Sequence, residues 1–451
     1  MTAIAELPGP RTVPLLGNAH RLAPGRLHVM IEQWGRRYGP AFRFAMGPRE
    51  VVAFADPEAV NTILRERPDA YRRWRELEQV TGELRLSGPF TSEGDDWRRQ
   101  RRLAVTALNS NHLRRYFDII ERATRRLHRR LPTGEPVEIL EDFMSYSVDI
   151  TSALAFGHDL NTLEHGDGEL QHHITRAFEL VARRTLAPFP YWKVVKPPVD
   201  RAAERSIAVI HEEIAKFIAA ARRRMDERPE LREQPENFLE SMLTTPGYDE
   251  QDIFGNVFTM LLAGEDTTAN TLAWATYLLA RDPTAQRRLH QEAENVLEGD
   301  ALPTRPEQID RMHFAEAVFR EAARLKSTAP LLFFEAIHDT SAGDVELPAG
   351  TRIICLTRQI ACPRGDRFDP GRWLTADHPD PRTFLSFGAG PRFCPGRNLA
   401  FLEGKTALTM LARNYTWEPA GAEPRERFGF TMRPTGLQVL LRPRKVRASN
   451  P

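Results

Sequence analysis

Cysteine and long apolar runs are what this sequence has least of. It contains three cysteines among 451 residues, an odd number that is too small for a disulfide framework. So few thiols are typical of a reducing compartment, and we expect a cytoplasmic location. The most apolar stretch, around residues 257–263, is far shorter than the roughly 18–20 apolar residues that a membrane-spanning helix needs. The sequence therefore predicts no integral membrane anchor.

An excess of charge of one sign is also missing. The 62 basic and 61 acidic residues leave a net charge of +1. Without a basic excess, we do not expect nucleic acid as the main partner. The first 18 residues lack a basic segment and contain three prolines, so they do not resemble a signal peptide. The chain has an ordinary globular composition and is long enough to bury a large core with a cofactor inside it.

Helical periodicity dominates the chain from about residue 95 to residue 300. The expected helices are 113–131, 137–157, 168–184, 200–226, 249–281, 283–297 and, further on, 307–326. Alternating runs at 41–45 and 51–54 predict a β-hairpin, and short β-type runs follow at 331–334, 352–356 and 437–441. No repeat or linker interrupts the chain. We expect one mainly α domain over residues 1–451, with small β-sheets at about 35–60, 330–380 and 425–443.

The expected helix 249–281 is too long and too apolar at its centre for a surface helix, so it is predicted to cross the core. Its middle reads Ala263-Gly264-Glu265-Asp266-Thr267-Thr268. A glycine inside a helix costs about 1 kcal/mol relative to alanine. A threonine hydroxyl can also bond to the carbonyl three or four residues back. Together these features predict a local opening of the helix, with room for a small ligand.

A glycine-rich segment near the end of the chain, 387–396, holds Cys394. Gly388, Gly390 and Gly396 allow a tight turn and the close approach of a flat ligand. Pro395 suits the first turn of a helix, and an amphipathic run follows at 398–413. We therefore expect Cys394 at a helix N-terminus, where unpaired N–H groups and the helix dipole favour a thiolate. On these grounds the thiol is inert, a nucleophile or a metal ligand.

The pattern Phe-x-x-Gly-x-Arg-x-Cys-x-Gly, met at Phe387, Gly390, Arg392, Cys394 and Gly396, resembles the haem-thiolate signature of the cytochromes P-450. The resemblance covers essentially the whole chain. It implies the P-450 fold, in which a long central helix crosses over a buried haem b. Cys394 would then be the axial ligand of the haem iron, and a thiolate in that place pushes electron density toward O–O cleavage. Phe387, Gly388 and Gly396 would form the loop beside the cofactor.

The segment 263–268 is similar to the oxygen-activating helix of the same family. The resemblance implies that Ala263 and Gly264 lie against the haem. Thr267 would orient protons toward bound dioxygen, and Asp266 would feed this relay. Glu265 is the alternative proton source, because the sequence does not decide which carboxylate faces inward.

Other family patterns concern the haem propionates. Trp97 and Arg101 match a Trp-x-x-x-Arg pattern whose N–H groups bind propionates, and Arg392 would be a second anchor. Many family members carry one more arginine in the strand after the Glu-x-x-Arg helix. This chain has Phe334 at about that place, which puts one propionate contact in doubt.

Glu321 and Arg324 are spaced i, i+3, a spacing that by itself indicates an ordinary surface ion pair. They match the family's Glu-x-x-Arg, and Phe368-Asp-Pro-Gly-Arg372-Trp follows downstream as its usual partner. The resemblance therefore implies a buried structural network of Glu321, Arg324 and Arg372 beneath the haem. The segment 358–366 departs from the family because it lacks the Trp and Asp-Pro often found there.

The implied activity is that of a haem-thiolate monooxygenase. It would insert one oxygen atom from O2 into a hydrophobic or amphipathic substrate, by hydroxylation or epoxidation. The chain has neither the cysteines for an iron–sulfur cluster nor the length for a flavin reductase. We therefore expect a monomer that receives electrons from a separate ferredoxin or flavodoxin with its reductase, and uses NAD(P)H only indirectly. The alternatives are a peroxide-driven or isomerising haem-thiolate enzyme and a non-enzymatic haem sensor, both disfavoured by the Asp266-Thr267 pair.

The substrate itself is not indicated. By family analogy Ala329, Leu331 and Leu332 lie close to the haem. The segments 71–75 and 188–192 mix aromatic and basic residues, which suits a fatty acid, but packed rings and solvated charges explain them equally well. A terpenoid or another natural product is an equal alternative. Surplus arginines around 98–102, with Arg397 and Lys405, predict a basic docking patch for an acidic electron donor.

Overall fold

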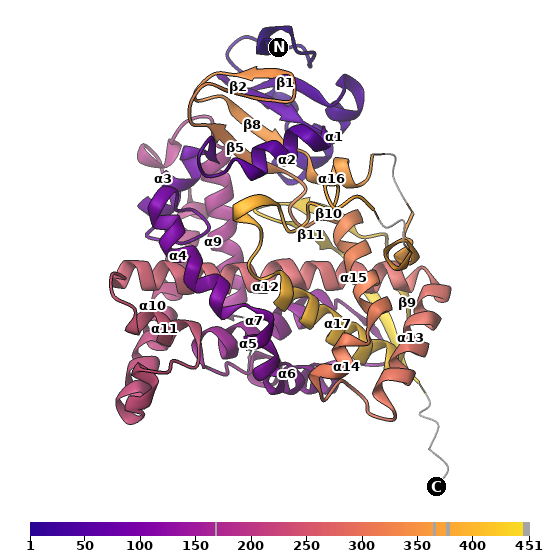
Figure 1. Ribbon diagram of the computed structural model, residues 1–451. Helices are drawn as coiled ribbons and strands as arrows, with labels where there is room; N and C mark the ends of the chain where they lie inside the picture. The colour runs from indigo at the N-terminus through magenta and orange to yellow at the C-terminus, as the bar shows by residue number, and fades with distance from the viewer. Residues whose placement is uncertain (167–168, 364–366, 376–378, 445–451) are drawn as a thin grey trace.

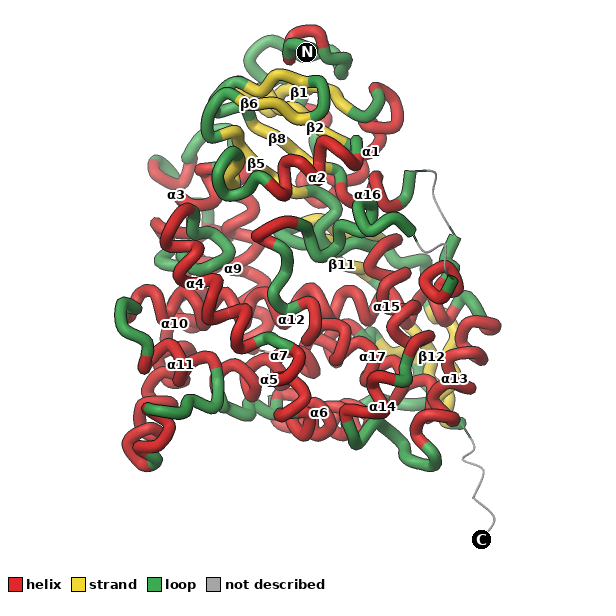
Figure 2. Tube along the Cα trace, viewed as in Figure 1, coloured by secondary structure: helices red, strands yellow, loops and turns green. Residues whose placement is uncertain are grey.

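The computed structural model describes residues 1–451 except 167–168, 364–366, 376–378 and 445–451. The first residue of the expected helix 168–184 and parts of the expected strand-rich region 330–380 lie outside the described residues. In Figures 1 and 2 a strand-rich part with the N-terminus lies at the top and a larger helical part lies below it. The expected architecture, mainly α with small sheets, is confirmed.

The largest sheet has five strands in the order β1-β2-β8-β5-β3. Their bounds are β1 Ala41–Met46, β2 Arg49–Phe54, β8 Arg352–Cys355, β5 Leu332–Ala336 and β3 Tyr71–Arg73. β2 and β8 are parallel and the other pairs are antiparallel. The alternation in β1 buries Phe42 and Phe44, and the ring of Phe44 packs 5.3 Å from that of Trp34. The expected hairpin at 41–54 is thus confirmed.

The other strands of the described residues form three smaller sheets. One is formed by β4 (Pro136–Val137), β12 (Gln438–Pro443) and β9 (Tyr415–Ala420), in that order. The other two are hairpins, β10 (Arg425–Phe428) with β11 (Met432–Thr435) and β6 (Thr340–Ala342) with β7 (Val345–Leu347). The β10–β11 hairpin matters for the site, because β11 lies against the central helix α12 (Glu250–Ala280).

Helix α12 runs through the middle of the molecule, as predicted (Figure 1). Asp249 caps it by accepting a 2.7 Å hydrogen bond from the N–H of Asp252. Its apolar residues are buried on nearly every side, so its stability comes from packing. The main partner is α7 (Leu140–Phe156), which lies alongside it. None of the helices in the described ranges has an apolar stretch long enough to cross a bilayer.

The remaining α-helices surround this pair. Their bounds are α1 Leu27–Tyr38, α2 Pro57–Arg65, α3 Arg75–Glu83, α4 Gly94–Ala107, α5 Ser110–Arg115, α6 Phe117–Arg130, α8 Thr162–His165, α9 Glu169–Leu186, α10 Pro198–Glu227, α11 Phe238–Thr244, α13 Pro283–Leu297, α14 Pro306–Asp310, α15 His313–Leu325, α16 Thr357–Ala361 and α17 Arg397–Asn414. The predicted helix 307–326 is wrong in one respect. It is two helices, α14 and α15, because Met312 has non-helical backbone angles between them.

Candidate functional site

Cys394 lies in a turn between the short 3-10 helix η7 (Gly390–Arg392) and α17. Its N–H donates a 2.8 Å hydrogen bond to the carbonyl of Phe387, which closes the loop. Gly388 and Gly390 both have φ of +69°, and a Cβ on Gly390 would lie 2.3 Å from the carbonyl oxygen of Leu64. Only glycine fits at Gly390. The loop is therefore held tightly against the end of α2.

The Cys394 side chain is half-buried at the start of α17, whose N-cap is Gly396. Burial raises the pKa of the Cys394 thiol, while the N–H groups of Gly396 and Arg397 and the charges of Arg101 and Arg397 act in the opposite direction. The predicted effect of the helix N-terminus is present but smaller than that of burial. A bound metal ion would deprotonate such a thiol outright.

The face of α12 that carries Ala263 and Thr267 is open. Ala263 is exposed and Thr267 half-exposed, although Leu262 and Thr268 on the same helix are buried. The Thr267 hydroxyl donates a 2.9 Å hydrogen bond to the Ala263 carbonyl one turn back, the back-bond that the sequence predicted. The predicted opening of the helix is wrong, because α12 continues through these residues without a break.

Gly264 faces another direction. A Cβ built on it would lie 2.3 Å from the Thr151 hydroxyl oxygen on α7. Gly264 therefore allows α12 and α7 to approach closely, and its geometry does not support the expected place beside the cofactor. The one-residue offset from Ala263 turns its side-chain direction by about 100° around the helix axis.

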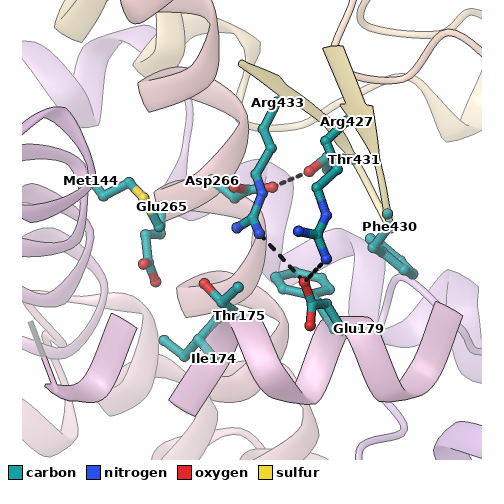
Figure 3. A pocket seen from close by; sticks show the side chains of 12 residues that line it. Met144, Ile174, Thr175, Glu179, Glu265, Asp266, Arg427, Phe430, Thr431 and Arg433 are labelled. Carbon is teal, nitrogen blue, oxygen red and sulfur yellow. Dashed lines mark hydrogen bonds and ion pairs between the residues drawn. The ribbon is translucent and has the colours of Figure 1, made fainter. Parts of the chain in front are cut away.

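Asp266 and Glu265 point in different directions (Figure 3). Asp266 accepts hydrogen bonds from the Thr431 hydroxyl of the β10–β11 hairpin and from Asn270, at 2.9 Å for the latter. Burial raises the pKa of Asp266, and these donors together with Arg433 act against the rise. Glu265 points away from the hairpin, and neither of its carboxylate oxygens has a hydrogen bond among the described residues. Burial and the neighbouring Asp266 raise the pKa of Glu265 well above its usual range.

Glu265 and Asp266 line a pocket, and charged residues of the β10–β11 hairpin and of α9 form its other side. Glu179 on α9 lies 3.2 Å from Arg427 and 3.3 Å from Arg433, so α9 is tied to both strands of the hairpin (Figure 3). The carboxyl groups of Glu265 and Asp266 line the same pocket as these three residues. Polar side chains therefore line the pocket from Asp266 to the ion pairs of Glu179.

The predicted propionate residues come together with the Cys394 loop. Trp97, on α4, is buried, and the guanidinium of Arg392 lies 4.4 Å above its ring. Arg101, one turn further, donates to the carbonyl of Phe393 and lies 4.9 Å over its ring. Arg392 donates to the carbonyl of Ser92 at 2.9 Å and pairs with Glu93. α4 is thereby fixed to the loop from both sides.

Glu321, Arg324 and Arg372 also come together. The Glu321 carboxylate is fully buried and lies 2.7 Å from Arg324 and 3.1 Å from Arg372. It accepts a further 2.9 Å hydrogen bond from the indole of Trp373 and a 3.1 Å bond from the N–H of Asp369. Arg324 in turn donates to the carbonyl of Ala361 at 2.8 Å. The network joins α15 to the segment that precedes the Cys394 loop.

The residues expected near the substrate lie at the start of β5. Leu331 is buried, Leu332 is half-buried, and the carbonyl of Ala329 accepts a 2.6 Å hydrogen bond from Thr357. Three phenylalanines that the sequence did not single out meet at the turn of the β10–β11 hairpin. The ring of Phe430 lies 5.4 Å from that of Phe90 and 4.8 Å from that of Phe178. The only sequence signal was an apolar residue in a glycine-containing turn, Gly429-Phe430.

The structure favours one of the two open explanations of the aromatic and basic segments and corrects one expectation about surface charge. In the segment 71–75, Tyr71 and Trp74 are buried core residues, and Arg72 and Arg75 pair with Glu78 and Glu335. Trp192 of the second segment likewise donates to Glu83. Lys405 is buried and lies 3.2 Å from Glu316, so it belongs to no exposed docking patch. Sequence alone cannot tell an exposed lysine from one that, like Lys405, is buried between helices beside a carboxylate.

These features suit a flat cofactor bound through a thiolate. The glycine loop presents Cys394 without side chains that would obstruct a planar group, and the Ala263–Thr267 face of α12 is left uncovered. The sequence model of the family described as Cytochrome P450 matches residues 7–441. The chain belongs to the cytochrome P450 family. It is a haem-thiolate monooxygenase that binds haem b, uses O2 and receives reducing equivalents through partner proteins.

Curated cytochrome P450 relatives match over nearly the full chain. A probable cytochrome P450 4s3 of Drosophila melanogaster is 28% identical over 447 residues, covering 92% of this chain and 86% of the relative. Cyclooctatin synthase of Streptomyces melanosporofaciens is 27% identical, covering 96% and 95%. The human mitochondrial 25-hydroxyvitamin D-1 alpha hydroxylase is 29% identical, covering 98% and 92%. The chain is about equally similar to relatives of very different names, so similarity does not select a substrate.

Proposed function

We propose that this cytochrome P450 hydroxylates or epoxidises an apolar or amphipathic molecule bound over the Ala263–Thr267 face of α12. The observation that carries the proposal is the open stretch on an otherwise buried central helix, with the Thr267 hydroxyl on it and the carboxyl group of Asp266 at the preceding position. The haem, when bound, supplies reductive activation of O2, in which two electrons and two protons place one oxygen atom in the substrate and release the other as water. Cys394 is proposed as its axial ligand.

Protons for this reaction are proposed to arrive through Asp266 and Thr267. Burial raises the pKa of Asp266, so the carboxyl keeps a proton to higher pH than an ordinary aspartate and can give it up to a neighbour. Its hydrogen bond to Thr431 and the nearby Arg433 link it to the polar side chains that line the pocket as far as Glu179. Glu265 has no such link among the described residues, which favours Asp266 as the proton source.

The substrate is proposed to lie against Phe90, Phe178 and Phe430, with Ala329, Leu331 and Leu332 at the haem edge. Aromatic and aliphatic walls favour an apolar body. A carboxylate anchor at the segment 71–75 is not favoured, because Arg72 and Arg75 already pair with glutamates. Because the walls are apolar and these arginines are already paired, we place terpenoid-like compounds ahead of fatty acids.

Electrons are proposed to come from a separate ferredoxin or flavodoxin with its reductase. Arg102 and Arg397 are exposed. Arg102 follows Arg101, which bonds to the Cys394 loop, and Arg397 is the first residue after that loop. An acidic donor would be attracted to such a face, and the attraction would weaken with salt. Lys405 takes no part in this surface.

The test is a screen followed by isotope labelling. Terpenes, lipids, aromatic compounds and macrolides are added to the ferric holoprotein, and binders are found by their spin-state shift. A binder is then turned over with a ferredoxin system under isotopically labelled dioxygen. We expect one labelled oxygen atom in the product. Product formed with peroxide and no donor, but not with the donor, would favour the peroxide-driven alternative, and oxygen uptake without any product would favour a haem sensor.

A further inference from the structure

Phe334 on β5 stands where the family resemblance led us to expect an arginine. Its ring is buried, with 1% of its surface exposed. A guanidinium nevertheless lies at this place, because the Cζ atom of Arg67 is 4.4 Å from the centre of the Phe334 ring. Arg67 comes from a different part of the chain, two residues after the end of α2. Arg67 thus brings a guanidinium group to the strand position that has no arginine of its own.

Arg67 lacks the hydrogen bonds that a buried arginine normally makes. Only 3% of its surface is exposed, and its Nε and Nη2 atoms have no hydrogen bond among the described residues. The nearest carboxylate oxygen, Oε1 of Glu93, lies 3.8 Å from Nη2, beyond hydrogen-bond distance. Buried donors are nearly always bonded, and a buried charge without close compensation is costly. The donors of Arg67 are therefore available for an anion.

Arg67 belongs to a cluster with Arg73 and Arg392, which we call the arginine cluster. Arg392 pairs with Glu93, and the backbone N–H of Arg73 donates to the same carboxylate at 3.0 Å. Burial and repulsion from neighbouring arginines lower the pKa of Arg67 well below its usual range and that of Arg73 to about 10. The guanidinium groups of Arg67 and Arg392 face Glu93, while that of Arg73 donates to the carbonyl of Phe90 at 2.8 Å, so a single carboxylate does not neutralise the cluster.

The arginine cluster lies beside the Cys394 loop. Arg392 is two residues before Cys394, and the loop touches the end of α2 at Gly390, whose added Cβ would meet Leu64 and Arg65. α2 and η7 pack against each other directly. A flat cofactor held by Cys394 would therefore present one edge toward Arg67.

We propose that Arg67 binds a haem propionate in place of the strand arginine, and that Arg73 and Arg392 complete the anion site. The proposal rests on haem binding, which the family establishes, and not on any particular substrate. An ionised propionate would supply negative charge that Glu93 alone does not provide to the arginine cluster. A guanidinium suits this task because its planar donors match a carboxylate in pairs. Stacking on Phe334 would hold the Arg67 plane in position.

The first test removes the charge. The Arg67→Gln holoprotein is mixed with excess apomyoglobin, and haem transfer is followed by the change in the Soret band. We expect transfer about tenfold faster than in the parent, from the loss of charge-assisted hydrogen bonds. The control is Arg98→Gln on α4, an exposed arginine paired with Asp69 and Asp95, which should leave the rate unchanged. A rate for Arg67→Gln within about twofold of the parent, a change too small for a lost charged bond, overturns the proposal.

The second test returns the charge to the strand. In the double variant Arg67→Gln/Phe334→Arg the guanidinium is placed where the family resemblance predicts it, and haem retention is expected to recover most of the loss. A purely structural role for Arg67 would not be rescued in this way, so failure to recover in a folded double variant contradicts the proposal. If Arg67→Gln does not accumulate, Arg67→Lys carries the test. Lysine keeps the charge but loses the paired donors, so haem transfer should be about threefold faster, and an unchanged rate overturns the proposal.

Discussion

Thr267 combines two properties at the residue scale. Its hydroxyl donates to the Ala263 carbonyl within the same helix, and it lies on the uncovered face of α12. The hydroxyl oxygen keeps free lone pairs, so it can accept a hydrogen bond from one side while it donates one on the other. A back-bonded threonine elsewhere in α12, such as Thr276, is fully buried and has no such role.

We expect Thr267→Ala to uncouple the reaction. Without the hydroxyl, proton delivery is disturbed, and reducing equivalents go to hydrogen peroxide instead of product. General acid–base steps are worth about 10²–10⁴-fold, so the product formed per NAD(P)H should fall strongly while oxygen uptake continues. The measurement is the ratio of product and peroxide to reductant consumed. The control is Thr276→Ala, which removes a similar back-bond, 2.9 Å to Leu272, and should keep the parent's coupling. Unchanged coupling in Thr267→Ala would refute the relay role.

At the scale of elements, Glu321 joins α15 to the 3-10 helix η6 (Pro370–Leu374) and the residues around it. One buried carboxylate neutralises Arg324 and Arg372 and accepts hydrogen bonds from Trp373 and Asp369. Because the network is buried, water cannot replace the Glu321 carboxylate if it is removed. The Cys394 loop, which follows η6 in the chain, depends on this support for its position.

We expect Glu321→Gln to destabilise the protein by about 3–5 kcal/mol, the typical cost of breaking a buried ion pair by removing one of its members. Unfolding of the holoprotein in urea, followed through the Soret band, measures the loss. The matched control is Glu213→Gln on α10, which removes an i, i+3 pair of the same spacing, Glu213 with Lys216 at 2.6 Å, from an exposed site. Its effect should stay below about 1 kcal/mol. Equal effects of the two substitutions would mean that the Glu321 network is no stronger than a surface pair.

At the scale of the whole molecule, Glu426 on β10 connects parts that are far apart in the sequence. Its carboxylate lies 2.9 Å from His28 on α1, 2.6 Å from Lys326 after α15 and 2.8 Å from Arg358 on α16. Burial alone would raise the pKa of Glu426. The hydrogen bond from His28 and the charges of Arg358 and Lys326 outweigh burial, and the pKa lies far below its usual range.

The lowered pKa of Glu426 predicts a pH dependence of stability. Unfolded glutamate has a pKa of about 4.3, so the stabilisation is complete above that pH and is lost as the pH falls toward the folded value. Glu426→Gln should therefore lower stability at pH 7 and flatten the acid side of the stability profile, measured as urea midpoints between about pH 7 and 3. The control Glu418→Gln removes an exposed pair with Arg442 and should keep the parent's profile. A parent-like profile in Glu426→Gln would contradict the prediction.

The sequence by itself determined the features that depend on local chemistry. A glycine-rich turn before a helix, an apolar helix of more than 30 residues and the β-hairpin at 41–54 follow from backbone freedom and hydrophobic period, and all three are present. The family could also be recognised from sequence, because its signature motif lies within ten consecutive residues, 387–396. The organisation as one domain over 1–451 stays a prediction.

Only the tertiary structure decided which groups face one another. Gly264 faces α7 and not the open face, Lys405 is buried against Glu316, and Asp266 rather than Glu265 meets the hairpin. The same holds for Arg67, which reaches Phe334 across 267 positions of sequence. The physical reason is that burial and charge pairing depend on distances in space. Residue spacing along the chain determines those distances only within a helix or a strand.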